Sequence, residues 1–279
     1  MDDNYIERLG EDFAIAHNPV FEYQDNHPYK LDQLLAIFCE DGSADGSVNL
    51  QRYHIEKNGF LIILPQHIME ASFVSKDFKG THIYMSERFL ANLNIGDAYQ
   101  FYESVERKPY FQLKEQMAEG LRQYINMAYN ILTVTRDHPN AEECVRLITK
   151  AFFLMLGWVL HKDVISPDAA GRQGEITNEF LELVRKNYPR HRDVDYYAGK
   201  MNMTPKYMST VVKRASGKSA LQWIEDYVIL DAKAQLSSSR KSIQEIAWNL
   251  QFDNQSFFGR YFKRGTGLSP SEYRRKYRR

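Results

Sequence analysis

Two basic stretches near the end of the chain repeat one pattern of residue types. VKRASGKSA at Val212–Ala220 and FKRGTGLSP at Phe262–Pro270 both read apolar, Lys, Arg, small, Ser or Thr, Gly, any residue, Ser, at a spacing of 50 residues. Lysine and arginine bind phosphate oxygens, because each neutralised phosphate releases condensed counterions. A glycine in this position typically ends a helix. The repeat therefore predicts two similar helices whose basic ends suit a polyanion.

The charges of the chain are divided between two parts of opposite sign. Residues 176–279 hold 20 Lys/Arg and 10 Asp/Glu, a balance of +10, whereas residues 1–175 hold 16 and 26, a balance of −10. The formal net charge of zero hides this division. A basic module is what binding to a nucleic acid requires, although charges also fall unevenly in proteins that bind none.

The residues around each stretch predict a helix, a short turn and a second helix, which together make a helix-turn-helix. In the first copy, about 194–214, Thr204 is placed as an N-cap and Pro205 at the first helical position. In the second copy, about 242–264, Ser242 can open a capping box. The second copy has one extra residue in its turn. Four large apolar residues have the spacing of a packing face and are expected in the core: Met208, Trp248, Phe258 and Phe262.

A longer helix is expected between the two copies, at about 219–238. A helix of ~17 residues within this range would span ~25 Å at 1.5 Å per residue. Two reading helices joined by such a rod could enter successive major-groove segments on one face of a duplex, ~34 Å apart. Repetition would then double the sequence information that one chain can read.

The second copy and its surroundings resemble the DNA-binding domain of the AraC/XylS family of transcription regulators. The stretch SIQEIAWNLQFDNQSFFGRYFKRGTGLSPSEYRR follows the family pattern at many fixed spacings: Ile246-Ala247, Phe252, Gln255-Ser256, Phe258, Phe262-Lys263, Thr266-Gly267, Pro270 and Tyr273-Arg274. The resemblance covers about residues 176–279, and YYAGKMNMT in the first copy matches more loosely. Gln251 stands where the family usually has glycine, so its turn would hold a non-glycine residue in a less favourable backbone region.

The outer face at the start of each second helix is where base-reading side chains are expected, and the resemblance points to the same places. In the first copy these residues are Lys206, Tyr207 and Thr210. In the second they are Gln255, Ser256, Gly259 and Arg260. Glutamine pairs bidentately with adenine and arginine with guanine, whereas Gly259 would permit close approach.

Four further basic residues are expected to hold phosphates, which position the protein without specifying sequence: Lys213, Lys218, Lys263 and Arg264. The alternative for every basic residue is a solvated surface charge. The tail Tyr273–Arg279 can equally be a phosphate-contacting arm or a frayed terminus.

The first hundred residues read as short strands separated by turn signals such as EDGSADGS and KNG. The expected strands are Leu34–Cys39, Leu50–Ile55, Phe60–Leu64, Ala71–Val74 and His82–Met85. Two helical runs follow within 112–161, and the second is apolar on most of its surface. Packing within its own domain and a dimer interface with a second copy are both consistent with this run.

The predicted fold class is α+β with two domains. Residues 1–161 are expected to form a cupin-like β-sandwich or barrel with a helical hairpin at 112–161, similar to the sensor and dimerisation domain of many family members. Residues 162–175 read as a linker, and residues 176–279 as an all-α domain with two helix-turn-helix motifs. The resemblance implies a homodimer, a small-molecule effector and a contact with RNA polymerase. The sequence identifies neither the effector nor its binding residues.

No catalytic, metal or cofactor motif stands out. Metal-dependent cupins use a close histidine pair, a carboxylate and a later histidine, but His54, His67, Glu70 and His82 do not have that spacing. Only Cys39 and Cys144 are present, with no disulfide framework, and no apolar run reaches the ~18 residues needed to span a bilayer. We therefore expect a cytoplasmic DNA-binding regulator, an activator, that binds promoter or operator DNA. A cupin enzyme fused to a DNA-binding domain and an architectural DNA binder are the alternatives.

Overall fold

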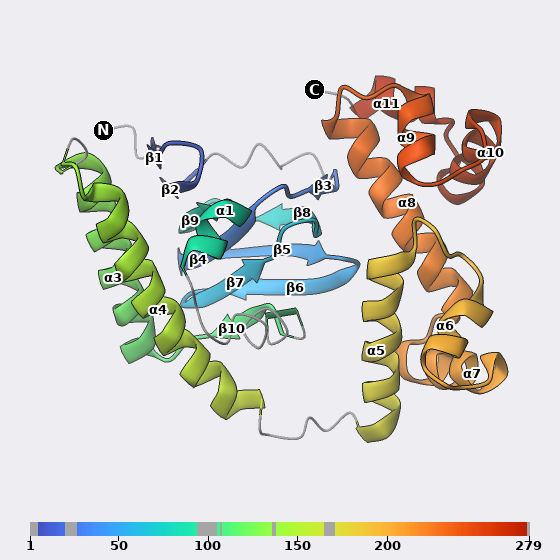
Figure 1. Cartoon of the computed structure of the whole chain (residues 1–279), viewed down its shortest axis with the longest axis horizontal. Coiled ribbons are helices and arrows are strands. Elements are labelled where there is room, and N and C mark those ends of the chain that lie inside the picture. The colour runs from blue at the N-terminus through green and yellow to red at the C-terminus, as the bar shows by residue number, and fades with distance from the viewer. Residues whose placement is uncertain are drawn as a thin grey trace.

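The structure, a computed structural model, describes residues 5–19, 27–93, 105–106, 108–135, 138–164 and 171–277. Two antiparallel sheets lie in its N-terminal part, and helices follow them (Figure 1). The larger sheet orders its strands as β1 (Tyr5–Leu9), β2 (Phe13–His17), β9 (Lys79–Met85), β4 (Leu34–Asp41), β7 (Gly59–Ile63) and β10 (Tyr110–Gln112). The smaller sheet orders them as β3 (Tyr29–Lys30), β8 (Ile68–Val74), β5 (Ser43–Val48) and β6 (Gln51–Glu56).

The central strands of the larger sheet are buried on both faces, which explains their continuous apolar sequences. Successive side chains of a strand point to opposite faces. Along β4, Leu34, Ala36 and Phe38 join the core beneath the helices, whereas Leu35 and Ile37 join the core between the two sheets. The alternation of β4 therefore builds the two layers of a β-sandwich.

Strand β5 was missed by the sequence analysis, because its residues SADGSV look like a turn. Ala44 and Val48 are nevertheless buried, and the strand pairs with both β6 and β8. The register with β8 shifts between Asp45 and Gly46. A Cβ on Gly46 would lie 2.6 Å from the carbonyl oxygen of Glu70, so only glycine allows this close approach.

Two long helices, α3 (Glu115–Thr133) and α4 (Ala141–Val164), cover the outer face of the larger sheet (Figure 1). A short helix, α1 (Glu87–Asn92), follows β9, with Ser86 as its N-cap. One face of α3 is buried, through residues that include Leu121, Ile125 and Ala128. Val145, Phe153 and Leu156 of α4 enter the same core. The helical run at 112–161 thus forms the expected hairpin against the sheet.

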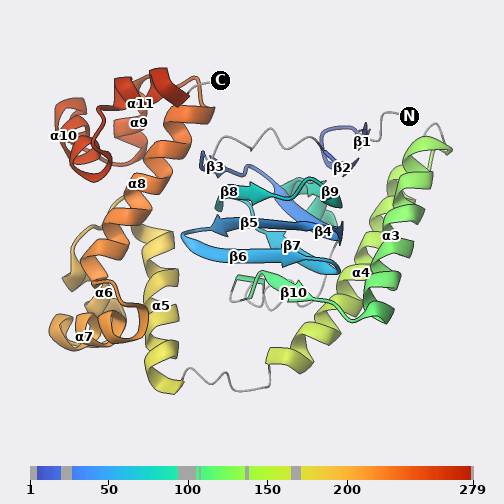
Figure 2. The same cartoon turned by 180° about the vertical axis from the view of Figure 1, so that it is seen from behind.

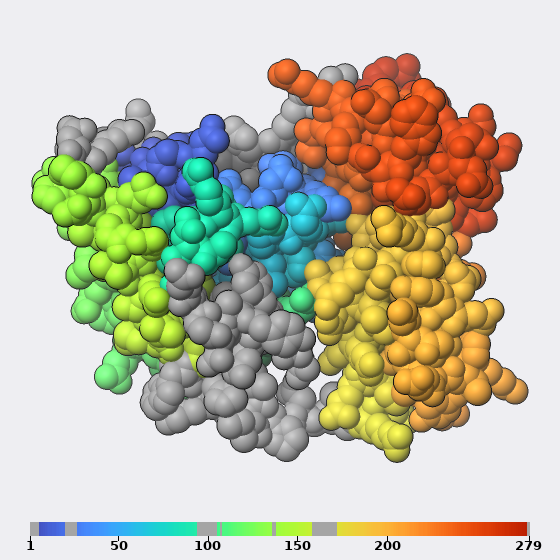
Figure 3. Space-filling model, viewed as in Figure 1, coloured from blue at the N-terminus to red at the C-terminus, as the bar shows by residue number. Residues whose placement is uncertain are grey.

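The C-terminal helices lie on the other side of the sandwich from α3 and α4 (Figures 1 and 2). They are α5 (Gly171–Asn187), α6 (Val194–Lys200), α7 (Pro205–Ser216), α8 (Ala220–Ser238), α9 (Ile243–Asn249), α10 (Gln255–Thr266) and α11 (Pro270–Tyr277). They share one apolar core, to which α8 contributes residues that include Ile224, Tyr227 and Val228. The space-filling view shows these helices gathered on one side of the molecule (Figure 3).

The predicted fold class is confirmed: an antiparallel sandwich with a helical hairpin precedes an all-α part with two helix-turn-helix motifs. The helices extend into the range expected as a linker, because α4 ends at Val164 and α5 begins at Gly171. The domain boundaries themselves stay a prediction. Within the described residues, no helix combines the length and the apolar character that crossing a membrane requires.

Candidate nucleic-acid interface

The two helix-turn-helix motifs are built in the same way, with one extra residue in the second turn as expected. Helices α6 and α9 start 49 residues apart, at Val194 and Ile243, and α7 and α10 start 50 residues apart, at Pro205 and Gln255. The turn of each copy contains one residue in the left-handed region. These residues are Asn202, with φ of 53°, and Gln251, with φ of 55°. Gln251 therefore adopts the backbone conformation for which the family uses glycine.

We expect Gln251→Gly to raise the free energy of unfolding of the C-terminal helices by about 0.5–1 kcal/mol. Glycine removes the steric cost of a Cβ in the left-handed region, and its larger freedom in the unfolded chain offsets part of that gain. Asn202→Gly is the matched control, and its gain should be smaller because asparagine tolerates this region. Urea denaturation measures both changes. A loss of stability in Gln251→Gly would contradict the strained turn.

The repeated basic stretch forms the end of one helix and the start of the next. Gly217 and Gly267 adopt left-handed φ values of 76° and 78°, and their amides donate to the carbonyls of Lys213 and Lys263. Two residues later, Ser219 caps α8, and Ser269 accepts from the amide of Glu272 in α11. The pattern of small residue, glycine and serine thus encodes a helix end and a new helix start.

One face of α7 carries the predicted contacts of the first copy. Lys206, Thr210 and Lys213 are exposed and spaced by four and three residues, so they lie along one side of the helix. Tyr207 is 49% exposed beside them. The Thr210 hydroxyl donates to the carbonyl of Lys206 at 2.7 Å, so its oxygen can still accept a hydrogen bond. The opposite face, which includes Met208, is buried.

One face of α10 repeats this arrangement 50 residues later. Ser256, Arg260 and Lys263 are exposed along one side of the helix, at the positions of Lys206, Thr210 and Lys213. Gln255 begins the helix and is exposed. Gly259 is half-buried, and a Cβ added to it would meet none of the described side chains or neighbouring segments within 4 Å. Phe258 and Phe262 are fully buried, as expected.

Helices α7 and α10 lie on the side of the helical part that is away from the β-sandwich (Figure 1). Both helices lie at the outer edge of the helical part, one toward each end of α8, in both views (Figures 1 and 2). Helix α8 has 19 residues, which is about 28 Å at 1.5 Å per residue. The structure therefore has the two candidate reading helices at the outer edge of the helical part, near opposite ends of α8.

The four candidate phosphate contacts differ in their present partners. Lys218 forms an ion pair with Asp226 at 2.7 Å, and Arg264 forms one with Glu225 at 2.8 Å. Lys213 and Lys263 are exposed in the last turns of α7 and α10, where their charges also complement the helix dipoles. Lys218 and Arg264 would exchange a carboxylate for a phosphate on binding, which reduces their net contribution.

The structure of this part differs from the sequence-based expectations at one residue and adds two features to them. Trp248 was expected in the core, but it is 55% exposed, because it lies on the outer side of α9, opposite Ile246 and Ala247. The tail forms helix α11 as far as Tyr277 and buries Tyr273, so it is not frayed there. Arg192 was not singled out, yet it donates to the carbonyl of Leu250 and lies 3.8 Å from the ring centre of Phe252. Nothing in the sequence around Arg192 indicates that its side chain packs against the turn of the second motif.

Two of the histidines considered as metal ligands have other side chains as partners in the structure. His54 pairs with Asp45 at 2.7 Å, and His67 accepts from Arg185 at 2.9 Å. Burial lowers the pKa of His82 to about 3. Among the described residues, no group of three or more His, Cys, Asp or Glu side chains is arranged to hold a metal ion.

A family model described as a helix-turn-helix domain matches residues 197–276, which include most of both motifs. The arabinose operon regulatory protein of Salmonella typhimurium is 39% identical over 84 residues, which are 30% of each chain. The transcriptional activator RhaR of Cronobacter sakazakii is 23% identical over 199 residues, 70% of this chain and 68% of its own. The TetD protein of transposon Tn10 in Escherichia coli is 30% identical over 100 residues, 36% of this chain and 72% of its own.

The match to the arabinose regulator spans less than a third of that protein's length. The match to TetD covers most of that shorter protein. The matched residues include both turns and the exposed faces of α7 and α10 described above. The chain belongs to the AraC/XylS family of transcription regulators.

Proposed function

We propose that the chain is a sequence-specific transcription regulator, an activator, that reads double-stranded promoter or operator DNA with α7 and α10. The observation that carries this proposal is the repetition of one exposed face. Lys206, Thr210 and Lys213 on α7 correspond to Ser256, Arg260 and Lys263 on α10. Both helices lie at the outer edge of the helical part (Figure 1). An exposed helix with polar and basic side chains at its start suits the major groove.

The residues on these helices divide by the contacts that their chemistry allows. Arg260 and Gln255 can each make two hydrogen bonds to one base edge, which gives direct readout. Lys206, Tyr207, Thr210 and Ser256 add single hydrogen bonds or apolar contacts, and Gly259 allows close approach. Phosphate contacts fall to Lys213, Lys218, Lys263 and Arg264, which fix the position of the protein on the duplex.

Competition binding tests sequence specificity. The full chain first selects duplexes from a random pool, and its affinity for a selected duplex is then compared with that for random DNA at one fixed salt concentration. A regulator should prefer the selected duplex by at least about 10³-fold. Equal affinity for both would indicate an architectural DNA binder, and no binding to either would contradict DNA binding altogether.

The chain is proposed to form a homodimer through α4. Five neighbouring residues on this helix form an exposed stripe, the α4 stripe: Cys144, Leu147, Ala151, Leu154 and Met155. Leu147 is 55% exposed and Met155 71%, whereas Val145, Phe153 and Leu156 of the same helix are buried in the core against the sheet. An apolar stripe of this kind on a long helix suits an isologous contact with the same stripe of a second copy.

Leu154→Ser is expected to raise the dimer dissociation constant by about tenfold, because the contact occurs twice in an isologous interface. Phe73→Ser is the matched control, since Phe73 on β8 is also 53% exposed but lies away from α4. Sedimentation equilibrium over a range of protein concentrations measures both constants. A wild-type chain that is monomeric at every concentration, or two variants with equal effects, would argue against this interface.

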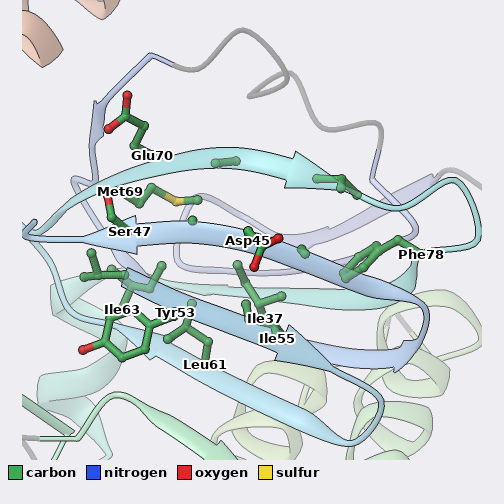
Figure 4. A pocket seen from close by; sticks show the side chains of 15 residues that line it. Ile37, Asp45, Ser47, Tyr53, Ile55, Leu61, Ile63, Met69, Glu70 and Phe78 are labelled. Atoms are coloured by element: carbon green, nitrogen blue, oxygen red, sulfur yellow. The ribbon is translucent and has the colours of Figure 1, made fainter. Parts of the chain in front are cut away.

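A small-molecule effector is proposed to bind between the two sheets. A small, partly open pocket lies there (Figure 4). Side chains of both sheets line it, among them Ile37, Ile55, Leu61, Ile63, Met69 and Phe78. This lining suits an apolar molecule or an apolar part of one. Operator affinity measured across a panel of such compounds tests the proposal.

Other parts of the interpretation follow from the proposed activity. A regulator of transcription acts where the DNA lies, which supports the cytoplasmic location predicted from the sequence. An activator also needs a contact with RNA polymerase. We propose no catalytic role, cofactor or metal, in keeping with relatives that are named as regulators.

A further inference from the structure

The N-terminal part contacts the second helix-turn-helix unit, α9–α11, and the helix α8 that joins it to the first unit, α5–α7. Ile68 of β8 packs with Leu230 and Ala234 in the second half of α8. The Ser237 hydroxyl donates to the carbonyl of Pro28 at 3.4 Å. The ring of His27 lies 4.2 Å from that of Tyr277 in α11, between ring centres. The N-terminal part therefore touches both α8 and the end of the second unit.

The β-sandwich also contacts the first unit, through Arg185 of α5. Arg185 forms an ion pair with Glu106 and donates to Nε2 of His67 at 2.9 Å. Burial and the Arg185 charge lower the pKa of His67 to about 3, so the imidazole is neutral and can accept this hydrogen bond. Helix α5 packs directly on α7. The N-terminal part thus contacts elements of both units.

Asp231 of α8 is the buried centre of the contact. Its side chain is only 2% exposed, and Lys30 of β3 reaches it at 3.2 Å. The Tyr188 hydroxyl of α5 donates to the same carboxylate oxygen at 2.5 Å. A buried carboxylate is costly without an opposite charge. Lys30 supplies that charge from the N-terminal part, so the carboxylate is fully compensated only while the sandwich lies on α8.

Hydrogen bonds continue from Asp231 into the second unit. Gln235 donates through Nε2 to the other oxygen of Asp231 at 3.1 Å. Asn249, the last residue of α9, donates through Nδ2 to Oε1 of Gln235 at 3.2 Å. A polar chain therefore runs from Lys30 through α8 to the helix that precedes the turn and α10.

We propose that the contact of the β-sandwich with α5, α8 and α11, centred on Lys30 and Asp231, holds the two reading helices in one relative position and so raises operator affinity. The inference rests on the proposed DNA-binding function. The contact leaves α7 and α10 uncovered, because both lie on the far side of the helical part (Figures 1 and 2). The contact restricts movement of one unit relative to the other. This restriction lowers the entropic cost of binding DNA with both reading helices.

Strand β8 places the effector pocket next to this contact. Met69 and Ala71 line the pocket, while Ile68 packs on α8. A compound that shifts β8 therefore acts on the position of α8 through one strand. The contact gives the pocket a direct route to the DNA-reading helices.

The first experiment removes the Lys30 charge from the full chain. Fluorescence anisotropy measures binding of Lys30→Met to a labelled duplex that the wild-type chain has selected from a random pool. We expect affinity to fall by about tenfold, within the range of coupling between distant sites. On a duplex with only one of the two half-sites, Lys30→Met and wild type should bind alike. Lys76→Met, an exposed lysine in the turn between β8 and β9, should stay within about twofold of wild type on both duplexes.

The outcomes separate this inference from the proposed function. Lys30→Arg keeps the charge and should keep the affinity, which distinguishes loss of the contact from a general folding defect. If Lys30→Met binds the selected duplex as tightly as wild type, or more tightly, the inference is overturned. The proposed DNA-binding function would remain intact. A wild-type chain that selects no duplex overturns the proposed function itself.

A disulfide provides the converse test. Pro28→Cys with Ser237→Cys, in a chain that also carries Lys30→Met and Cys144→Ser, lets oxidation restore the contact without the lysine. The oxidised chain should bind the selected duplex within about threefold of wild type, and the reduced chain should stay about tenfold weaker. Weak binding after oxidation, or failure of the disulfide to form when Lys30 is present, would overturn the inference.

Discussion

Phe258→Ala is expected to lower the free energy of unfolding of the C-terminal helices by about 3–5 kcal/mol. Phe258 is fully buried in α10 and packs on Phe252 and Phe262, with ring centres 5.2 and 5.9 Å away. Truncation removes this burial and leaves a cavity that the helices can close only in part. The second reading helix depends on this packing for its position, so operator binding should weaken as well.

The adjacent residue is the matched control for this change. Phe257 is 45% exposed, so Phe257→Ala should cost about 1 kcal/mol or less. Urea denaturation can be followed by fluorescence of Trp223, which lies in the same core, after Trp158 and Trp248 are replaced with phenylalanine. Equal losses in the two variants would mean that α10 does not pack as described.

Arg260→Ala is expected to relax base preference at one position of the operator by about 1–3 kcal/mol, a factor of about 5–150. Arg260 is exposed on the face of α10 that carries Ser256 and Lys263. Its guanidinium can form two hydrogen bonds to guanine, and alanine forms none. Affinity should therefore fall for the duplex with the preferred base and stay unchanged for the duplexes with the other three bases.

Lys263→Ala provides the contrast, because Lys263 lies one turn farther along the same face. A phosphate contact is independent of sequence, so this variant should weaken binding to all four duplexes alike and reduce the salt slope by about 1. Affinities on the four single-base variants of the selected duplex measure both changes. If Arg260→Ala weakened binding to all four duplexes equally, Arg260 would contact a phosphate and would not read a base.

Regular patterns in the sequence were enough to predict the helical part. The glycine and serine of each basic stretch, the capping residues and the apolar spacing act within a few residues, and the structure has Gly217, Gly267 and Ser242 in the expected local roles. Trp248 was wrongly expected in the core, because a helix of only seven residues has too few turns to indicate which side is buried. Strand β5 was missed because a bulge requires Gly46, which also signals a turn.

The contacts between the sandwich and the helices could not be predicted. Lys30 and Asp231 are 201 residues apart in the chain, and nothing in the spacing of either residue indicates a partner. Asp231 follows the apolar stretch Tyr227–Leu230 of α8, but a carboxylate in that position does not identify its partner. Local rules determine the two units, but the arrangement that relates them depends on tertiary packing.

Hydroxyl-radical footprinting of the full chain on a selected duplex tests most directly whether α7 and α10 read DNA together. Each chain should protect two stretches on the same face of the duplex, with centres about 10 base pairs apart, because that distance separates successive major-groove segments on one face. A single protected stretch per chain, or two stretches on opposite faces, would show that the paired helices do not enter neighbouring grooves.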